Sequence, residues 1–459
     1  MKKLYITLFL AILSFQGLNS QAIQGKLLGT WSDSTLVGST AFDNTYNEIW
    51  GIVANGVEYA ILGTTQGTHF IDVSDPTKPN NIITIDGGTT GVDIIHRDYH
   101  DYNGYLYAVA DEGPQSTLQI MDLSFLPDSV SIVYDSKELI RRSHNIFIDT
   151  SSAILYSCIS DGDNVPYAQL RLFDISDPFN PEIIADYSSI SNFAFSQVHD
   201  TYVQNDTAYL NCGPDGFLIA DFSDPLAPEG LAGLRPADYV QSGYNHSGWL
   251  SEDGKTYFMA DETWSQDIKV LDVSDLPNLT VIDTIDAGSD HFLTIPHNQV
   301  VHGDYLYSAY YYDGLQVWDI KDVNNIERVM HYPTSNKPHR QDYEGAWGVY
   351  PFLPSGHILV SDMQEGLFVI DNIENTVHTS DPVSELQEAW TVSPNPSSGY
   401  FKIDTKPELI NPTLELYTTR GEKIMNLKKE NQIELAEGIY IIRLTSEKIE
   451  SSKPIYITH

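Results

Sequence analysis

The alternation of apolar and polar residues along this chain repeats with a long period. Seven times, an apolar strand-like segment ends in an aspartate, and most copies continue into a turn resembling Ser-Asp-Pro. Successive aspartates lie 47 to 52 residues apart, which is the length of one supersecondary unit of about four short strands. The seven positions are Asp72, Asp122, Asp174, Asp221, Asp272, Asp319 and Asp371.

The repeat around Asp319 shows the strand pattern most clearly. Between residues 297 and 332, four segments rich in alternating, β-branched or aromatic residues are separated by turns that contain Gly or Asp. This pattern predicts four antiparallel strands in each repeat. Because one small sheet cannot bury both of its faces alone, seven such units are expected to pack side by side in a ring. The sequence therefore predicts an all-β fold, with a seven-bladed β-propeller over residues 23–378.

The N-terminal residues carry two further signals. Residues 1–22 begin with Met-Lys-Lys and an apolar run too short to span a bilayer, which predicts a cleaved secretory signal peptide. Residues 26–31 then form a strand-like segment ahead of the first repeat, while the last repeat lacks a clear fourth strand. We expect this early strand to complete the last unit, because closing the ring removes both open sheet edges.

The pattern changes after residue 378. Residues 379–389 read as a polar linker, and residues 390–459 alternate strand-like segments with Pro and Gly turns. This organisation predicts a second domain, a small β-sandwich at the C-terminus. Apart from the leader, no segment approaches the length of a transmembrane helix, so no transmembrane segment is predicted.

The charge is unevenly distributed. Residues 23–389 contain 14 basic and 54 acidic residues, whereas residues 390–459 contain 9 of each. A body with that excess of negative charge repels nucleic acid and attracts cations, so no nucleic-acid partner is expected. Plain solubility accounts for much of the excess.

The two cysteines, Cys158 and Cys212, fall at matching points of adjacent repeats, and either two buried thiols or a disulfide fits the exported location.

Histidines recur where the first strand of each repeat is expected to begin. This position holds His100, His144, His199, His246 and His297 in five repeats, and tryptophan in the other two. The turn after the second strand holds carboxylates, notably Asp111, Glu112, Asp261 and Glu262. Imidazole with carboxylate suits Zn, Fe, Mn or Cu, and carboxylates alone suit Ca. The sequence thus predicts a divalent metal site at these nine residues, against the alternative that each histidine only caps its repeat.

The C-terminal region resembles a known export module. The segments SPNPSSG, LYTTRGEKI and LAEGIYIIRL, followed by KPIYITH, occur in order within residues 390–459. They are similar to the C-terminal sorting domain of the type IX secretion system of Bacteroidota. This resemblance implies that the type IX secretion machinery is a partner of the chain. It also implies a protein that is secreted or attached to the outer-membrane cell surface.

The body resembles a second family. The motifs NHSGW at residues 245–249, GAWGVYPFLPSG at 345–356 and GLFVID at 366–371 are similar to those of the choice-of-anchor B proteins, which are related to LVIVD-repeat propellers. The resemblance implies a surface-anchored propeller and brings no settled activity with it.

Two functions remain open at this point. The first is a binding protein whose long loops on one face recognise a surface polymer, a peptide or a small molecule. The second is a metal-dependent secreted enzyme, a hydrolase, lyase or oxidoreductase, with the histidines as its metal site. The common catalytic signatures, such as GxSxG, HExxH and the P-loop, are absent from the sequence.

Overall fold

The structure is a computed structural model that divides into two units, residues 1–372 and residues 373–459. It describes residues 22–289, 291–373 and 375–376, and then 390–395, 397–405, 412–418, 423–433, 435–436, 438–445 and 450–458. The predicted linker, residues 379–389, lies outside these ranges, as does the predicted signal peptide except for its last residue. The described strands belong to small sheets that are antiparallel except for one parallel pair, so the all-β class is confirmed.

Among its described residues, the first unit contains seven sheets of four or five strands, each built on three or four strands that follow one another in the sequence. These successive strands form an antiparallel meander, and sheets are numbered here in chain order. Sheet 1 consists of β3 (Tyr46–Ala54), β4 (Val57–Thr64), β5 (Gly67–Asp72) and β6 (Asn80–Asp86). Sheet 2 consists of β7 (Arg97–Tyr102), β8 (Tyr105–Ala110), β9 (Leu118–Asp122) and β10 (Ser131–Ser136). Sheet 3 consists of β11 (Asn145–Asp149), β12 (Ile154–Gly162), β13 (Val165–Asp174) and β14 (Glu182–Tyr187).

The remaining four sheets repeat this plan. Sheet 4 consists of β17 (Asp200–Gln204), β18 (Thr207–Asn211), β19 (Phe217–Asp221) and β20 (Glu229–Leu234). Sheet 5 consists of β21 (Asn245–Leu250), β22 (Thr256–Asp261), β23 (Ile268–Asp272) and β24 (Thr280–Ile285). Sheet 6 consists of β25 (Gln299–His302), β26 (Tyr305–Ala309), β27 (Leu315–Asp319) and β28 (Glu327–Tyr332). Sheet 7 contains β29 (Ala346–Tyr350), β30 (Ile358–Asp362) and β31 (Gly366–Ile370). A separate two-strand ribbon, β15 (Ser189–Ile190) and β16 (Phe193–Ala194), links sheets 3 and 4.

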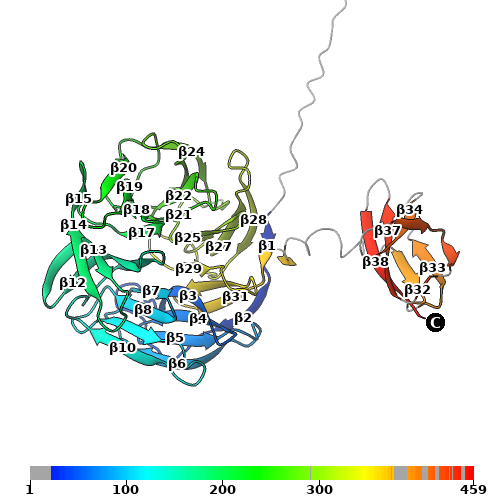
Figure 1. The fold of residues 1–459 in the computed structure, drawn as a ribbon, viewed down its shortest axis with the longest axis horizontal. Helices are drawn as coiled ribbons and strands as arrows, with labels where there is room; N and C mark the ends of the chain where they lie inside the picture. The colour runs from blue at the N-terminus through cyan, green and yellow to red at the C-terminus, as the bar shows by residue number, and fades with distance from the viewer. Residues whose placement is uncertain are drawn as a thin grey trace, which may run out of the picture. The chain divides into compact units, whose positions relative to one another are not determined.

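The first strands of the seven sheets contact one another in a closed circuit. Going around it, β3 contacts β7, then β11, β17, β21, β25 and β29 follow in turn, and β29 contacts β3 again. The sheets surround this circuit, as the ribbon in Figure 1 shows. All residues that begin a first strand therefore lie around one axis, at the same end of it.

The N-terminal strand completes the seventh sheet, as the sequence predicts. Strand β2 (Leu27–Trp31) pairs antiparallel with β31, so the outermost strand of the last sheet comes from the opposite end of the unit. The backbone N–H of Asp371 also donates to the carbonyl of Lys26 at 2.9 Å. The preceding strand β1 (Ile23–Gln24) pairs parallel with β28 and adds a fifth strand to sheet 6, which the sequence did not predict.

The seven repeated aspartates have a common structural role. Each stands at or just after the end of the third strand of its sheet, and its side chain accepts a hydrogen bond from a backbone N–H one or two residues later. For example, the N–H of Ser176 donates to Asp174 at 2.9 Å, and that of Ser274 donates to Asp272 at 2.9 Å. Such a side chain mimics a backbone turn and ends the strand at a fixed residue. The repeat is thus a turn signal rather than a site of chemistry.

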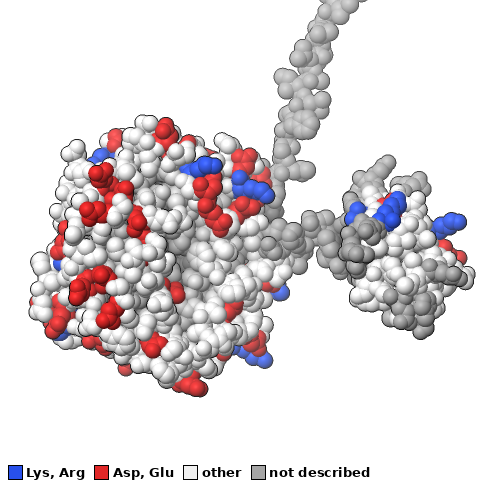
Figure 2. Space-filling model, viewed as in Figure 1, with Lys and Arg blue, Asp and Glu red and all other residues white. Residues whose placement is uncertain are grey.

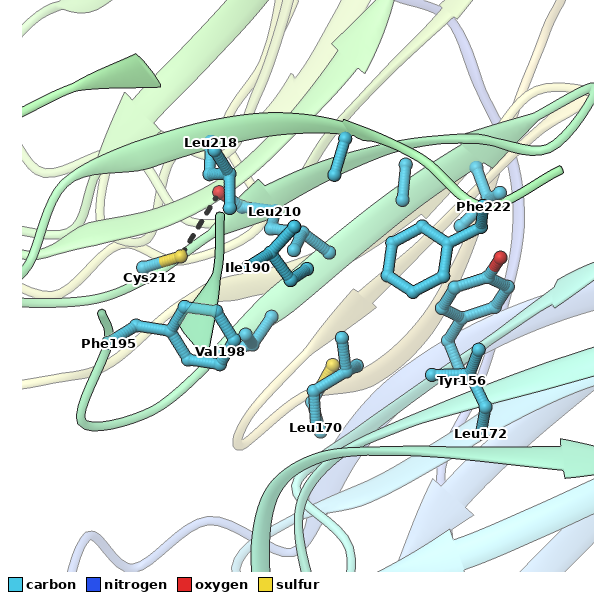
Figure 3. Packing of buried hydrophobic residues seen from close by; sticks show 14 of the residues in the cluster. Tyr156, Leu170, Leu172, Ile190, Phe195, Val198, Leu210, Cys212, Leu218 and Phe222 are labelled. Carbon is cyan, nitrogen blue, oxygen red and sulfur yellow. Dashed lines mark hydrogen bonds between the residues drawn. The ribbon is translucent and has the colours of Figure 1, made fainter. Parts of the chain in front are cut away.

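The hydrophobic core lies between neighbouring sheets. Figure 3 shows one of these layers, in which side chains of sheets 3 and 4 interlock, with Tyr156 and Phe222 in edge-to-face contact at a ring separation of 5.3 Å. Ile190 of β15 and Phe195 of the following loop cover the same layer. Because this packing repeats around the circuit, it fixes the spacing between the first strands. The residues at the ends of these strands are therefore held at fixed positions around the axis.

Both cysteines belong to this layer as buried free thiols. Burial raises the pKa of the Cys158 thiol and of the Cys212 thiol far above the ordinary range, so neither forms a reactive thiolate at neutral pH. We expect Ellman's reagent to detect almost no thiol in the native protein and two per chain after denaturation without reductant. Fewer than two thiols in the denatured sample would show that the residues are joined in a disulfide.

The second unit has two small sheets around its own core. One contains β32 (Trp390–Ser393), β33 (Tyr400–Thr405) and β36 (Glu430–Gln432). The other contains β35 (Lys423–Asn426), β34 (Thr413–Thr418), β37 (Gly438–Thr445) and β38 (Glu450–Ile457). Buried residues of both sheets, including Trp390, Phe401 and Leu416, form one cluster. This unit therefore buries a core without help from the first.

Acidic side chains are scattered over the visible face of the first unit and outnumber the basic ones there (Figure 2). On this face the acidic residues are thus dispersed rather than gathered in one patch. Among the described residues, no helix has the length and hydropathy needed to cross a membrane.

Candidate functional site

Five histidines and one tryptophan meet at the end of the axis where the first strands begin. We call this set the mouth ring; it consists of His96, His144, His199, His246, His297 and Trp347. His96, His144 and His199 directly precede β7, β11 and β17, whereas His246 and Trp347 are the second residues of β21 and β29. Because the packed sheets fix the first strands around one axis, these side chains converge although they come from six different sheets.

The six rings of the mouth ring form a closed circle. The ring centroids of His199 lie 4.1 Å from those of both His144 and His246. The circle continues from His246 to His297 at 4.5 Å, from His297 to Trp347 at 4.4 Å, and from Trp347 to His96 at 5.3 Å. His96 and His144 close it at 4.9 Å.

Four of the histidines are held by the same ring nitrogen. The Nδ1 atom of His144 lies 2.9 Å from Asp111, and that of His96 is hydrogen-bonded to Glu112. The Nδ1 atoms of His199 and His297 donate to the backbone carbonyls of His246 and Trp347 at 3.2 and 2.5 Å. A carbonyl or carboxylate at Nδ1 keeps the proton on that atom and leaves Nε2 unprotonated. None of these four Nε2 atoms has a hydrogen bond to any residue that the structure describes.

The environment keeps most of the mouth ring uncharged. Burial, reinforced by the neighbouring histidines, lowers the pKa of His199 and His246 well below the usual value and that of His297 to about 3. Burial acts in the same direction on His144, but its hydrogen bond to Asp111 raises its pKa overall. Neutral imidazole is the form that coordinates a metal, so at least three of the rings are ready donors at neutral pH.

The mouth ring lines a cavity of about 200 Å³, together with Phe42, Glu262, Tyr311 and Tyr343. Glu262 receives a hydrogen bond from the hydroxyl of Tyr311 at 2.6 Å and approaches Nε2 of His246 at 3.8 Å. Burial raises the pKa of Glu262 to about 7. Two groups of three possible ligands result, in each of which the donor atoms lie within 4.8 Å of one another: His96, Asp111 and His144, and His246, Glu262 and His297.

The comparisons with known proteins bear on the C-terminal unit. Residues 391–458 match the family model of a secretion system C-terminal sorting domain. The tail marks the chain as a secreted or cell-surface protein and the type IX secretion machinery as its export partner. No curated protein matches the sequence.

The solved structures that are similar to this chain include PorZ, a bacterial surface component of the type IX secretion system of Porphyromonas gingivalis, with 13% sequence identity and a TM-score of 0.47. The match covers 93% of this chain and 61% of the PorZ chain, so this chain spans less than two thirds of PorZ.

The structure corrects the predicted position of two residues. His100 does not lie in the mouth ring: it is the fourth residue of β7, and His96 takes its place. Asp261 faces away from the cavity into the protein, where the ammonium group of Lys269 lies 3.0 Å from its carboxylate and both side chains are fully buried. Tyr239, Gly243 and Asn245 also donate to Asp261, so its oxygens are occupied by the protein itself.

The other predicted residues lie at or directly behind the cavity. His144, His199, His246, His297 and Glu262 line it, Asp111 lies beside His144, and Glu112 holds His96. The carboxylate of Glu112 also accepts the backbone N–H groups of Ile95 and His96 at 2.9 Å each, which fixes the segment that carries His96.

A second layer, which the sequence analysis missed, lies deeper along the axis. It contains the carboxylates Glu48, Asp98 and Asp200, which line a cavity of about 30 Å³ together with the five histidines. Burial raises the pKa of Glu48 and of Asp200 to about 7, and that of Asp98 well above its ordinary range. The signal was present as an acidic residue one or two positions after the histidine in His96-Arg97-Asp98 and His199-Asp200.

Proposed function

We propose that this chain is an exported cell-surface protein of the choice-of-anchor B type, with a seven-bladed β-propeller whose mouth ring binds a divalent transition-metal ion. The closed circuit of seven sheets supports the propeller, and the motifs around His246 and Trp347 support the family. In this account the ion is the point at which a ligand attaches, which makes the protein a binding protein. The long loops that precede the first strands surround the same cavity and would contribute to recognition.

The observation that carries the proposal is the shared orientation of the histidines. In metal sites, a histidine typically donates one ring N–H to a carboxylate or carbonyl and coordinates the metal with the other nitrogen. His96, His144, His199 and His297 all have that arrangement at Nδ1. The Nδ1 hydrogen bond alone would suffice for a structural cap, but here all four histidines also line one cavity, and their Nε2 atoms have no hydrogen-bond partner among the described residues.

The donor set favours certain ions. Imidazole nitrogen with one or two carboxylates suits Zn²⁺, Cu²⁺, Fe²⁺ or Mn²⁺, whereas Ca²⁺ prefers a shell of oxygens. His246 and His297 with Glu262 form the more buried of the two possible groups, and we add His199 to this proposed ligand set because its ring lies 4.1 Å from that of His246. We therefore assign the ion to this side of the ring, with Asp111 and Glu112 orienting the opposite side.

Replacing His246 or His199 by alanine is expected to weaken Zn²⁺ binding at least about 100-fold, because each change removes a ligand from the proposed set. Isothermal titration calorimetry on the full chain measures this directly. His302→Ala is the matched control, since His302 is exposed at the far end of β25 and should leave the affinity unchanged. Equal affinities in all three variants, with unchanged melting temperatures, would show that the ring is a structural cap.

A second candidate function, a metal-dependent hydrolase, is favoured by the placement of Glu262. Its carboxylate lies in the cavity beside two proposed ligands, where it could accept a proton from a water molecule activated there. Glu262→Gln would then abolish turnover of a substrate while zinc still binds. A chain that binds zinc and turns over no ester, amide or phosphoester in a broad screen would support the binding function instead.

A further inference from the structure

The axis has a second opening at the end where the first strands finish, and it is lined by aromatic rings. A cavity of about 590 Å³ lies there, next to the last residues of β11 and β17 and the turns that follow them. His144 precedes β11 and Thr150 follows it, so this cavity and the mouth ring lie at opposite ends of the first strands. Nothing in the proposed metal site uses this end of the molecule.

Seven aromatic side chains form a closed circle at the floor of this second cavity. We call the set the aromatic collar; its members are Trp50, His100, Phe147, Tyr202, Trp249, Phe352 and Tyr350. Neighbouring ring centroids lie between 4.6 Å, for Tyr202 and Trp249, and 5.8 Å, for Trp249 and Phe352. All members except Tyr350 line the cavity. Aromatic packing alone does not require the rings to border an open cavity.

The charged side chains around the collar are acidic, because Asp149 lines the cavity and Asp101 contacts Trp50. Among the described residues that line the cavity there is no lysine or arginine. The indole N–H of Trp50 donates to the carboxylate of Asp101 at 2.8 Å, which enriches the electron density of the ring. Behind the collar, a smaller cavity of about 60 Å³ is bordered by Trp50, His100, Phe147 and Trp249 on one side and by the carboxylates Glu48, Asp98 and Asp200 on the other.

The aromatic collar also carries no positive charge of its own at neutral pH. Burial lowers the pKa of its single histidine, His100, so that the imidazole is neutral there. The Nδ1 atom of His100 donates to the carbonyl of Asp101 at 3.0 Å, which fixes the ring in the circle. A positively charged ligand would therefore meet aromatic rings at the floor of the cavity and the carboxylate of Asp149 beside them, with no lysine or arginine among the described residues that line it.

We propose that the aromatic collar binds the quaternary ammonium group of a small molecule. Ring faces attract cations through their quadrupole, and a quaternary ammonium is the cation that aromatic cages recognise best. It is weakly hydrated and has no N–H to satisfy, which matches a floor made of rings rather than hydrogen-bond acceptors. The neutral side chains at the rim, including Gln204 and Asn205, leave room for the polar remainder of the ligand. The described residues that line the cavity include no lysine or arginine, so an anionic ligand would find no counter-charge there.

The test compares choline with its uncharged carbon analogue, 3,3-dimethylbutan-1-ol, which has the same shape. Tryptophan fluorescence of the full chain reports binding, since Trp50 and Trp249 belong to the collar. We expect choline to bind about tenfold more tightly than the alcohol, the size of one or two cation–π contacts. Equal binding of the two compounds would reduce the site to an apolar pocket and overturn the proposal. So would a fluorescence response to neutral oligosaccharides with none to choline.

Two variants locate the site. Phe147→Leu and Trp50→Leu each remove one ring of the collar and should weaken choline binding several-fold. Phe292→Leu is the control, because Phe292 is 72% exposed and precedes β25 at the opposite end of the first strands. Thermal melting identifies any variant that fails to fold. If a variant does not fold, the comparison of choline with the alcohol in the unchanged protein still tests the proposal. Undiminished choline binding by both folded variants would place the site elsewhere and contradict it.

Discussion

Replacing Asp261 by asparagine should lower the free energy of unfolding of the first unit by about 3–5 kcal/mol. The reason is the fully buried ion pair between Asp261 and Lys269, whose nitrogen and oxygen lie 3.0 Å apart. The amide can still accept hydrogen bonds from Tyr239 and Asn245, but it leaves the ammonium group without a counter-ion. Burial already lowers the pKa of Lys269, although Asp261 acts against that shift, so losing the carboxylate would push the lysine towards its neutral form.

Denaturant titration of the full chain measures this effect. Asp253→Asn is the matched control in the same sheet, because Asp253 forms an exposed pair with Lys255 at 3.3 Å and such pairs contribute little. Adding Lys269→Met to Asp261→Asn should restore part of the lost stability, since the double variant buries no charge. A loss below about 1 kcal/mol for Asp261→Asn alone would mean that the pair is hydrated in solution.

A chain that begins at residue 32 should be destabilised and prone to association, compared with one that begins at residue 23. The deletion removes β1, which pairs with β28, as well as β2, and it leaves the edge of β31 unpaired because Leu27, Gly29, Thr30 and Trp31 pair with residues 367–370. It also removes Leu28 and Trp31 from the core between sheets 7 and 1. We expect a loss of about 5 kcal/mol and a melting temperature about 5–10 °C lower.

Differential scanning calorimetry and size-exclusion chromatography follow the two consequences of this deletion. An exposed strand edge is a template for pairing with another chain, so the shortened protein should elute partly as oligomers. Gly29→Val should disturb β2 less severely than the deletion does, because a Cβ at Gly29 would lie 2.4 Å from the carbonyl oxygen of Pro76. A shortened chain that remains monomeric and melts at the original temperature would show that β2 does not close the ring.

The strands could be predicted from the sequence because each repeat contains the turn residues that end its strands. The aspartate at the end of the third strand forms the same turn in six of the seven sheets, so one local rule locates most of the strands. The closing role of β2 followed from counting strands and finding one missing from the last repeat. Strand β1 was missed because two residues, Ile23 and Gln24, carry no periodic signal.

The candidate site was predicted only in part, because the axis of the ring is a tertiary feature. His96 and His100 are both plausible in the segment His96-Arg97-Asp98-Tyr99-His100, and the choice depends on where β7 begins. The strand starts at Arg97, which leaves His96 at the mouth and places His100 in the aromatic collar. Nor could the sequence show that Asp261 is neutralised by Lys269 of the neighbouring strand, while Glu262, one residue later, reaches the cavity.

The carboxylate layer and the aromatic collar were missed for the same reason. Residues of a strand alternate between two faces, but the sequence does not tell which face of a first strand points to the axis. Once the mouth ring is located, the carboxylates follow one or two positions after its histidines, and the residues of the collar follow two positions after that. Glu48 and Trp50 on β3, and Asp98 and His100 on β7, illustrate this step of two residues.

The most direct test of the proposed metal site is the metal content of the full chain, exported from cells and purified without chelators. We predict about one equivalent of a transition metal per chain, measured by inductively coupled plasma mass spectrometry. A variant with His199, His246 and His297 replaced by alanine should contain almost none, while retaining the melting behaviour of an intact fold. Substoichiometric metal in the unchanged protein, or equal metal in both proteins, would contradict the assignment of the mouth ring as a metal site.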